Sequence, residues 1–408
     1  MPELAQRRRC AREIFDYALA SVDPRKAVRE AIVSDGPIVE VCGERCDLST
    51  QPLYAVAIGK AAASMARGLD DAIGDKLSRG VITAPPVSRV YSSRWEIFAG
   101  GHPLPNEASL AAAHSTFALL DEANIERGVV IFLVSGGGSA MIEWPTSPDV
   151  TLDDLRRANE MLVGCGARIN EINAVRRAFS AVKGAALARR APNARIVTLI
   201  VSDTNPGDEA SVASGPTLAA DGPDPLDVIQ RYDLDLPIPV LKSASPLTSP
   251  YRVLLDNSTA LQAAQQKAIE LGLNPLISWD ICEQPIQEGC NLLLTQRNTD
   301  CLISGGEFSC PVRGDGRGGR NLETVLRLAL AESNVVALSA GTDGIDGNSP
   351  AAGAIADETT LTRARNLGLD PAEYLDRSDS YSFFEALGDL IVTGPTETNV
   401  RDLRILIR

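Results

Sequence analysis

The sequence predicts an α/β protein with two lobes. Seven short apolar runs, each ending in small or polar residues, have the length and composition of buried strands, and helical patterns lie between most of them. Buried strands that alternate with helices are typical of parallel sheets covered on both faces. The chain has 408 residues, 44% of them hydrophobic, so it can bury a large core, and its length favours two domains over one.

The predicted strands indicate where a ligand would bind. In parallel sheets, ligands bind beyond the carboxyl ends of the strands, so the small and polar residues after each apolar run are candidate binding segments. With those residues included, the strands are predicted over 54–62, 129–139, 195–204, 251–259, 301–307, 335–344 and 390–396.

The clearest helices follow from hydrophobic spacing and end signals. Residues 1–22 form an amphipathic pattern with charges on both sides, which predicts a helix of the folded protein and not a signal peptide. Val175, Phe179 and Val182 have helical spacing, and their helix is expected to end before Pro192. The other helices are predicted over 61–71, 151–166, 260–271 and 321–331, with the Val175 helix over 172–190.

A proline-rich stretch marks the expected connection between the lobes. Residues 216–250 contain seven prolines and little periodicity, which is typical of a connecting segment. We therefore expect an N-terminal domain over 1–235 and a C-terminal lobe over 250–408. As an alternative for the first helix, residues 1–22 pack on the C-terminal lobe instead of on the N-terminal domain.

Composition excludes several classes of function. The 39 Lys and Arg against 53 Asp and Glu give a net charge of −14 with no basic tail, which argues against nucleic acid as a partner. No apolar segment reaches the roughly 20 residues of a membrane span, so we expect a soluble, cytoplasmic protein. Eight scattered cysteines without a CxxC pair, and two histidines, make a zinc site or a disulfide framework improbable. Any metal is expected to be a hard ion bound to oxygen.

The first candidate site is SGGGSA, the segment Ser135, Gly136, Gly137, Gly138, Ser139 and Ala140, which follows an apolar run. Its closely spaced backbone N–H groups at a helix start favour an anion, and we predict phosphate binding there. The alternative is a tight turn that requires positive φ angles. The segment is neither a Walker A loop nor a GxGxxG fingerprint.

Two cationic candidates follow other strands. Lys60 comes after Gly59 at a strand end, where a lysine binds a carboxylate or a phosphate as a point charge. A solvated lysine at a helix start is disfavoured, because a cation there opposes the helix dipole. His102, in the turn GGHPLPNE, is a minor candidate, since a lone histidine in such a turn is more often structural.

Carboxylates after two strands suit a metal or a proton acceptor. Asp203 and Asp208 follow the run that ends near residue 201, and Mg²⁺ prefers one or two carboxylates together with substrate phosphates. A local turn and helix cap is the alternative, and it would satisfy Asp208 more readily than Asp203. Asp343 and Asp346 follow a later strand, without the spacing of a calcium loop.

A glycine-rich loop, GDGRGGRNLE, formally matches GxGxxG at residues 314, 316 and 319. We interpret the match as a false positive, because no acidic residue follows at the spacing that would hold a ribose. The remaining prediction is a flexible loop that delivers Arg317 and Arg320 to a helix start, where arginine suits a transferring phosphoryl group.

Several of these motifs, in order from about residue 53 to 408, resemble the class II glycerate kinases, the family with a MOFRL domain at the C-terminus. They are GKAAASMA, GGHPLPNEA, SGGGSA, INEINAVRRAFSAVKGAALA, VSDTNPGDEASVASGPT, GRGGRNLE, SAGTDGIDG and TGPTETNVRDLRI. The resemblance implies a Rossmann-like N-terminal domain with a mainly parallel sheet, a smaller α/β C-terminal domain, and an active site in the cleft.

The resemblance also implies an activity, the transfer of the γ-phosphoryl group of ATP to the 2-hydroxyl of D-glycerate, with Mg²⁺ or another divalent metal. Lys60 and Arg320 correspond to the functional lysine and arginine of the family. We expect the loop 135–139 and Asn321 to bind ATP phosphates, and Asp203 and Asp208 to bind metal. Lys60, Arg320, His102 and Asn399 are the expected substrate contacts, while Asp343 or Asp203 accepts the proton.

The chain departs from the family pattern at four positions. Leu322 stands in place of glutamine, Phe308 and Ser309 in place of threonines, and Glu397 in place of glycine. The alternatives to a kinase are an NAD(P)H-dependent hydroxypyruvate reductase and a non-enzymic, two-lobed sugar-acid-binding protein. The expected partners are the small-molecule substrates, with neither nucleic acid nor membrane, and a homodimer is possible.

Overall fold

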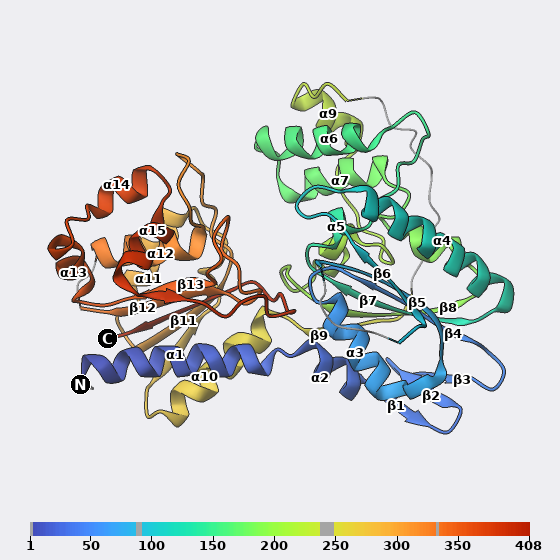
Figure 1. Cartoon of the computed structure of the whole chain (residues 1–408), viewed down its shortest axis with the longest axis horizontal. Helices are drawn as coiled ribbons and strands as arrows, with labels where there is room; N and C mark the ends of the chain where they lie inside the picture. The colour runs from blue at the N-terminus through green and yellow to red at the C-terminus, as the bar shows by residue number, and fades with distance from the viewer. Residues whose placement is uncertain (1–2, 87–91, 237–248, 332–333) are drawn as a thin grey trace. The chain divides into compact units, whose positions relative to one another are not determined.

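The computed structural model describes residues 3–86, 92–236, 249–331 and 334–408. The chain divides into two compact units (Figure 1). The N-terminal unit is Pro24–Leu254, and the C-terminal unit combines Met1–Asp23 with Leu255–Arg408. Residues 237–248 of the expected proline-rich connection lie outside the described residues.

The N-terminal unit contains a six-stranded sheet in the order β6-β5-β4-β7-β8-β9. The pairings from β6 to β8 are all parallel, as predicted for this unit. Each residue of the central strand β7 is buried, which is expected where helices cover both faces of a sheet. The strands are β4 Leu53–Ile58, β5 Leu77–Ala84, β6 Trp95–Ala99, β7 Val129–Ser135, β8 Arg195–Val201 and β9 Tyr251–Leu255.

The helices of this unit include the predicted helices 61–71 and 151–166, as α3 and α6, and several short ones. Asn106 caps α4 through a capping box with Ser109, and Thr151 caps α6 in the same way with Asp154. A small antiparallel sheet, which the sequence did not predict, consists of β1 Ile32–Asp35, β2 Ile38–Val41 and β3 Glu44–Asp47. The helices are α2 Pro24–Ala31, α3 Ala62–Ile73, α4 Glu107–Glu126, α5 Gly138–Met141, α6 Leu152–Gly164, α7 Ile169–Phe179, α8 Ala186–Arg190 and α9 Pro225–Arg231, with 3-10 turns η1 Gly74–Lys76 and η2 Glu209–Ser214.

The predicted helix over 172–190 is wrong, because the chain leaves the helix between α7 and α8. Ser180 pairs with Pro145 in an isolated antiparallel bridge, and the N–H of Ala181 donates to the carbonyl of Trp144 at 2.8 Å. Ala185 has a φ of 64°, in the left-handed region. Pairing with a distant segment therefore overrides the helical spacing of the sequence.

The C-terminal unit contains a second six-stranded sheet, in the order β10-β11-β15-β12-β13-β14. The pair β10 and β11 is parallel, but β15 runs antiparallel to both of its neighbours, β11 and β12. The expectation of a parallel sheet is therefore wrong for this unit. The strands are β10 Pro275–Ser278, β11 Cys301–Gly306, β12 Val336–Gly341, β13 Gly353–Ala356, β14 Leu390–Ile391 and β15 Asp402–Ile407.

Helices cover both faces of this second sheet (Figure 1). On one face, Ile14 and Phe15 of α1 join Leu261 of α10 and Ile303 of β11 in one apolar cluster. On the other, α12 and α15 pack over β13 in a separate cluster. None of the helices in the described residues has the length and hydropathy needed to cross a membrane. The helices are α1 Leu4–Ser21, α10 Asn257–Glu270, α11 Ile286–Thr295, α12 Arg320–Ala331, α13 Thr360–Asn366, α14 Pro371–Asp376 and α15 Ser380–Leu387.

Candidate functional site

The carboxyl ends of β4 and β7 are joined by hydrogen bonds. The N–H of Lys60 donates to the carbonyl of Gly136 at 2.9 Å, and the N–H of Ala61 donates to the Ser135 hydroxyl at 3.0 Å. That hydroxyl donates to the carbonyl of Ile58 at 3.2 Å, so the buried Ser135 side chain serves to tie the two strand ends together. Gly59, with a φ of 110°, is required here, because a Cβ would lie 2.3 Å from the Ser135 carbonyl oxygen.

Lys60 and His102 flank the middle of the glycine segment. A Cβ on Gly137 would lie 3.1 Å from Cγ of Lys60 and 3.3 Å from Cδ2 of His102. Gly137 itself has a φ of 79°, which favours glycine. The structure therefore brings together three of the candidates predicted from separate parts of the sequence.

A hydroxyl network holds the end of the glycine segment. The hydroxyls of Ser139 and Ser214 are 2.6 Å apart, and Ser214 donates to Oδ1 of Asn173 on α7 at 3.1 Å. Gly138 packs so closely that a Cβ would lie 2.7 Å from the Cβ of Ala213. Neither Asn173 nor Ser214 was predicted as a site residue. The signal in the sequence was a polar asparagine beside the apolar residues of the predicted helix 172–190.

A buried ion pair lies behind this segment. Lys183 pairs with Glu143, and their side chains are 2% and 5% exposed. The Ser180 hydroxyl also donates to Glu143, which follows α5 in the chain. Burial lowers the pKa of Lys183, and the Glu143 carboxylate opposes that shift. Because both charges are satisfied by each other, the pair anchors α5 and offers no open ligand position.

The two predicted metal ligands lie on the loop after β8. Asp203 is partly buried, and Asp208 is exposed. One oxygen of Asp208 accepts the Ser211 hydroxyl at 2.6 Å, and its carbonyl accepts the N–H of Ser211 at 2.9 Å, which is the local turn described as the alternative. No group of three or more His, Cys, Asp or Glu within the described residues is arranged to bind a metal ion. A Mg²⁺ ion held mainly by substrate phosphates needs no such group.

In the C-terminal unit, Arg320 begins α12 and lies between two carboxylates. Its Nε donates to Oδ2 of Asp402 at 2.6 Å, and its Nη2 donates to Oδ1 at 3.1 Å. The same Nη2 lies 2.8 Å from Oε1 of Glu307. Burial acts to lower the pKa of Arg320, but the Asp402 and Glu307 carboxylates raise it overall. The guanidinium is therefore charged and fixed in orientation.

Asp346 caps the same helix from a distant loop. Its Oδ1 accepts the N–H of Asn321 at 3.1 Å, and its Oδ2 accepts the N–H of Leu322 at 2.8 Å. Burial raises the pKa of Asp346 to about 7, although these N–H donors act to lower it. The side chain of Asn321 is held as well, since its Oδ1 accepts the Ser339 hydroxyl at 2.6 Å. The first turn of α12, with Arg320 and Asn321, is thus fixed by buried polar groups.

Asp343 lies beside the Arg320 clamp. A Cβ on Gly341 would lie 3.1 Å from Oδ1 of Asp343 and 3.5 Å from Oδ1 of Asp402, so these carboxylates approach the same point. Oδ1 of Asp343 also accepts the N–H of Ile345 at 3.2 Å. The buried Asn399 accepts the N–H of Arg401 at 3.4 Å, and the carbonyl of Arg401 accepts the N–H of Thr342 at 3.0 Å. Asp343 and Asn399 therefore lie near the end of β12 and the start of β15, where Asp402 binds Arg320.

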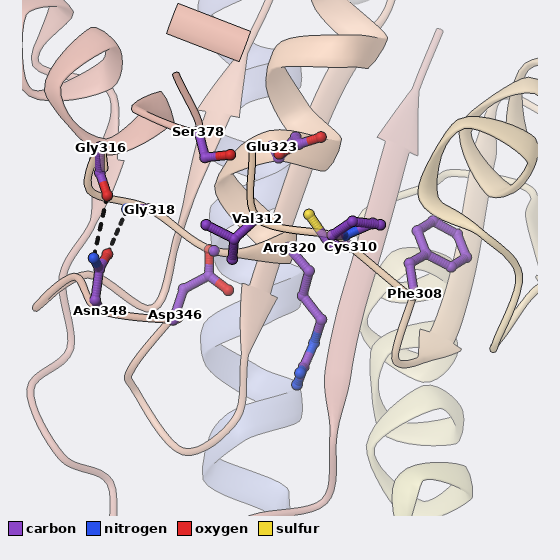
Figure 2. A pocket seen from close by; sticks show the side chains of 13 residues that line it. Phe308, Cys310, Val312, Gly316, Gly318, Arg320, Glu323, Asp346, Asn348 and Ser378 are labelled. Carbon is purple, nitrogen blue, oxygen red and sulfur yellow. Dashed lines mark hydrogen bonds between the residues drawn. The ribbon is translucent and has the colours of Figure 1, made fainter. Parts of the chain in front are cut away.

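A pocket of about 410 Å³ opens at the start of α12 (Figure 2). In Figure 2, Phe308 and Cys310 lie at one side and Gly316 and Asn348 at the other, while the Arg320 guanidinium points away from Ser378. The wall combines glycines, apolar side chains and polar side chains. They are Gly316, Gly318, Gly319 and Gly347; Phe308, Cys310, Pro311 and Val312; and Arg320, Glu323, Asp346, Asn348 and Ser378.

The GxGxxG segment uses its N–H groups within the protein. The N–H of Gly316 donates to the carbonyl of Arg377 at 3.0 Å, and the N–H of Gly318 donates to Oδ1 of Asn348 at 2.8 Å. The guanidinium of Arg317 lies 4.3 Å from the ring centre of Tyr381. The prediction that this loop brings Arg317 to the same helix start as Arg320 is therefore wrong, because Arg317 stacks on α15.

Two family models match the chain. Residues 10–244 match a domain described as "Domain of unknown function (DUF4147)", and residues 300–402 match the MOFRL family. The matched ranges cover most of the chain, so the similarity is not confined to one motif.

Named relatives are similar over nearly the whole length. A putative hydroxypyruvate reductase of Agrobacterium vitis is 38% identical over 98% of this chain and 94% of its own. A D-glycerate 2-kinase of Thermotoga maritima is 32% identical over 98% of this chain and 97% of its own. The solved structure of glycerate kinase from Thermotoga maritima aligns with a TM-score of 0.82 at 32% identity, covering 100% of both chains.

Proposed function

Because this chain belongs to the glycerate kinase family that combines a DUF4147 domain with a MOFRL domain, we propose that it is an ATP-dependent glycerate 2-kinase. It would transfer the γ-phosphoryl group of ATP to the 2-hydroxyl of D-glycerate, giving 2-phospho-D-glycerate and ADP. The observation that supports this most strongly is the fixed guanidinium of Arg320, at the position that the family resemblance assigns to a functional arginine.

Phosphoryl transfer depends mainly on positioning and on neutralising negative charge. Arg320 suits this role. Its Nε and Nη2 contact Asp402, and Nη2 also contacts Glu307, so Nη1 is the guanidinium nitrogen that takes part in neither contact. A planar guanidinium held in this way binds a phosphoryl oxygen without losing much side-chain entropy. Asn321, the next residue, is 1% exposed and its Nδ2 donates to Oδ1 of Asp346 at 3.3 Å, so its assignment to the nucleotide phosphates stays a prediction.

Lys60 and the glycine segment have the corresponding role in the N-terminal unit. Gly137 lies against Lys60 and His102, and a Cβ at this position would crowd both side chains. We assign Lys60 to a carboxylate or phosphate, with His102 as a further contact, and the backbone of residues 135–139 to phosphate. Asn399 is the corresponding substrate candidate of the C-terminal unit.

The proton acceptor and the metal ligands are assigned from the carboxylates. Asp343, beside the Arg320 clamp, or Asp203 would accept the proton of the 2-hydroxyl. Asp203 and Asp208 are hard oxygen donors that fit Mg²⁺, and one oxygen of Asp208 is already used by Ser211. A bound Mg²⁺ would supply charge neutralisation at the phosphate oxygens.

A second candidate is an NAD(P)H-dependent hydroxypyruvate reductase, because a relative from Agrobacterium vitis carries that name. The GxGxxG segment argues against it, since the N–H groups that would meet a pyrophosphate donate to Arg377 and Asn348. A third candidate, a binding protein without catalysis, predicts binding of glycerate with no turnover.

One set of assays separates the three candidates. The protein is incubated with ATP, Mg²⁺ and D-glycerate, and phosphorus NMR identifies the product. We expect 2-phosphoglycerate and ADP. Oxidation of NADPH or NADH by hydroxypyruvate without formation of a phosphoglycerate would contradict the kinase, and the absence of both products would favour a binding protein.

A further inference from the structure

We propose that the pocket at the start of α12 binds the nucleoside part of the phosphoryl donor, its base and ribose. This inference rests on the proposed kinase function and adds a location for the part of ATP that does not react. It uses residues outside the predicted site, chiefly Val312, Ser378 and the glycines of the 314–319 loop.

The charges of the pocket exclude the anionic parts of the substrates. Three of its lining residues are charged, and each is already satisfied by other described residues. Glu323 pairs with Arg327 at 2.7 Å, Asp346 accepts the N–H groups of α12, and Arg320 is held by Asp402. A triphosphate or a glycerate carboxylate inside the pocket would meet the carboxylates of Glu323 and Asp346. The one lining cation, Arg320, has only Nη1 outside its contacts with Asp402 and Glu307. An uncharged ligand is therefore favoured.

The volume and walls point to a flat, mostly apolar group with polar edges. At about 410 Å³, the pocket is within the range of small-molecule sites, roughly 300–1,000 Å³, and it is large for a three-carbon acid. Phe308 and Pro311 provide apolar wall, and Val312 is 80% exposed, so a ring placed against it would remove apolar surface from water. The nucleoside is the one uncharged part of the proposed substrates with this size.

The glycines keep the opposite wall flat. The N–H of Asn348 donates to the carbonyl of Gly318 at 3.1 Å, and a Cβ on Gly347 would lie 2.0 Å from that carbonyl oxygen. Ser378 adds a hydroxyl that accepts the N–H of Arg313 at 3.0 Å, which leaves its own proton for a ligand. A base edge or a ribose oxygen would be a suitable acceptor.

The position of the pocket agrees with this assignment. Arg320 lines it and also begins α12, and Asn321 follows directly. A nucleoside in the pocket would therefore have its phosphate chain directed toward the two residues assigned to phosphates. No step of the reaction would take place in the pocket itself.

The first test is photolabelling of the unmodified full-length protein with 8-azido-ATP, followed by peptide mapping. We expect label in the segments 308–319, 347–348 or 378, and protection by excess ATP. Label at other segments, or no label in a protein that turns over ATP, would overturn the assignment. A protein that makes no phosphoglycerate would refute the proposed function separately, because labelling reports binding and not turnover.

The second test compares two surface variants. Val312→Asp places a charge in the pocket mouth, and Ile269→Asp makes the same change at a 60% exposed residue of α10 outside the pocket. Adenosine, which has no phosphate, is used as a competitive inhibitor against ATP. We expect Val312→Asp to weaken adenosine inhibition about tenfold and Ile269→Asp to leave it unchanged. Equal inhibition of both variants, with melting temperatures unchanged, would overturn the proposal.

Discussion

Arg320 and Asp402 form a two-point clamp, in which Nε and Nη2 of the arginine donate to the two carboxylate oxygens at 2.6 and 3.1 Å. Asp402 is 1% exposed, so the carboxylate depends on this partner for its charge balance. The clamp gives Arg320 two separable roles, one in holding the fold and one in binding phosphoryl oxygens. These roles can be measured independently.

Replacing Arg320 with alanine is expected to lower kcat by about 10³ to 10⁵, the range found when an arginine that stabilises a phosphoryl group is lost. It should also cost about 1–3 kcal/mol of unfolding free energy, because Asp402 is left buried without its donor. Steady-state kinetics and urea unfolding measure the two effects. The double change Arg320→Ala with Asp402→Asn should recover stability and not activity. Near-normal kcat in the single variant would refute the catalytic role.

Asp346 is expected to make stability depend on pH. Its pKa is raised from 3.8 to about 7 in the folded protein, so the folded state binds the proton more strongly than the unfolded state. This contribution is fully present below about pH 4 and is lost as the pH rises through about 7. The unfolding free energy of the wild type, measured relative to Asp346→Asn, should therefore fall between these values. A constant difference across that interval would contradict the prediction.

Gly137→Ala is expected to impair binding of the anionic substrate. The new Cβ would lie 3.1 Å from Cγ of Lys60, and the residue must keep a φ of 79°. We expect kcat/KM to fall by about tenfold to a hundredfold, on the scale by which a misplacement of about 1 Å impairs catalysis. The control is Gly164→Ala, where no atom lies within 4 Å of the new Cβ and φ is not positive. Equal kinetics of the two variants would show that Lys60 tolerates the change.

Breaking the Lys183–Glu143 pair is expected to destabilise the N-terminal unit. Lys183→Met leaves Glu143 charged and buried, which typically costs about 3–5 kcal/mol. The double variant Lys183→Met with Glu143→Gln removes both charges and should recover part of that loss. A double-mutant cycle from urea unfolding measures the coupling. Additive effects of the two single changes would mean that the pair contributes no mutual stabilisation.

Asp203→Asn is expected to raise the Mg²⁺ concentration needed for half-maximal activity by about tenfold, since a carboxylate ligand is lost. Asp208→Asn should have a smaller effect, because Asp208 already accepts the Ser211 hydroxyl. Titration of Mg²⁺ at fixed ATP measures both variants. An unchanged requirement in Asp203→Asn would remove that residue from the metal site.

The strands that were predicted are confirmed, because buried apolar runs are local properties of the sequence, but β5, β6, β10, β13 and β15 were not predicted. Each of the seven predicted runs contains a strand, including β7 at Val129–Ser135. The break between α7 and α8 could not be predicted, because it depends on Pro145 and Glu143, which are distant from Ser180 in the sequence. Strand β15 was not predicted at all, and its antiparallel pairing depends on β11 and β12, which both come much earlier in the chain.

The sequence could predict which residues are candidates for the site, but not how they are arranged in space. A lysine after a glycine at a strand end indicated a point charge, and the structure adds that Lys60 lies beside Gly137 and His102. The cap on α12 comes from Asp346, on a loop after another strand, so no local pattern reveals it. The roles of these residues in catalysis stay predictions.

The position of β15 constrains the order in which the chain matures during synthesis. This strand lies between β11 and β12, yet residues 402–407 are translated after every other strand of that sheet. The N-terminal unit is Pro24–Leu254, so all of its residues have been translated before most of the C-terminal unit, and domains generally fold as units during synthesis. Helix α1 is synthesised first, but the sheet on which it packs, which contains β11 and β15, is synthesised much later. The Arg320–Asp402 clamp can consequently form only after every other strand of that sheet has been synthesised.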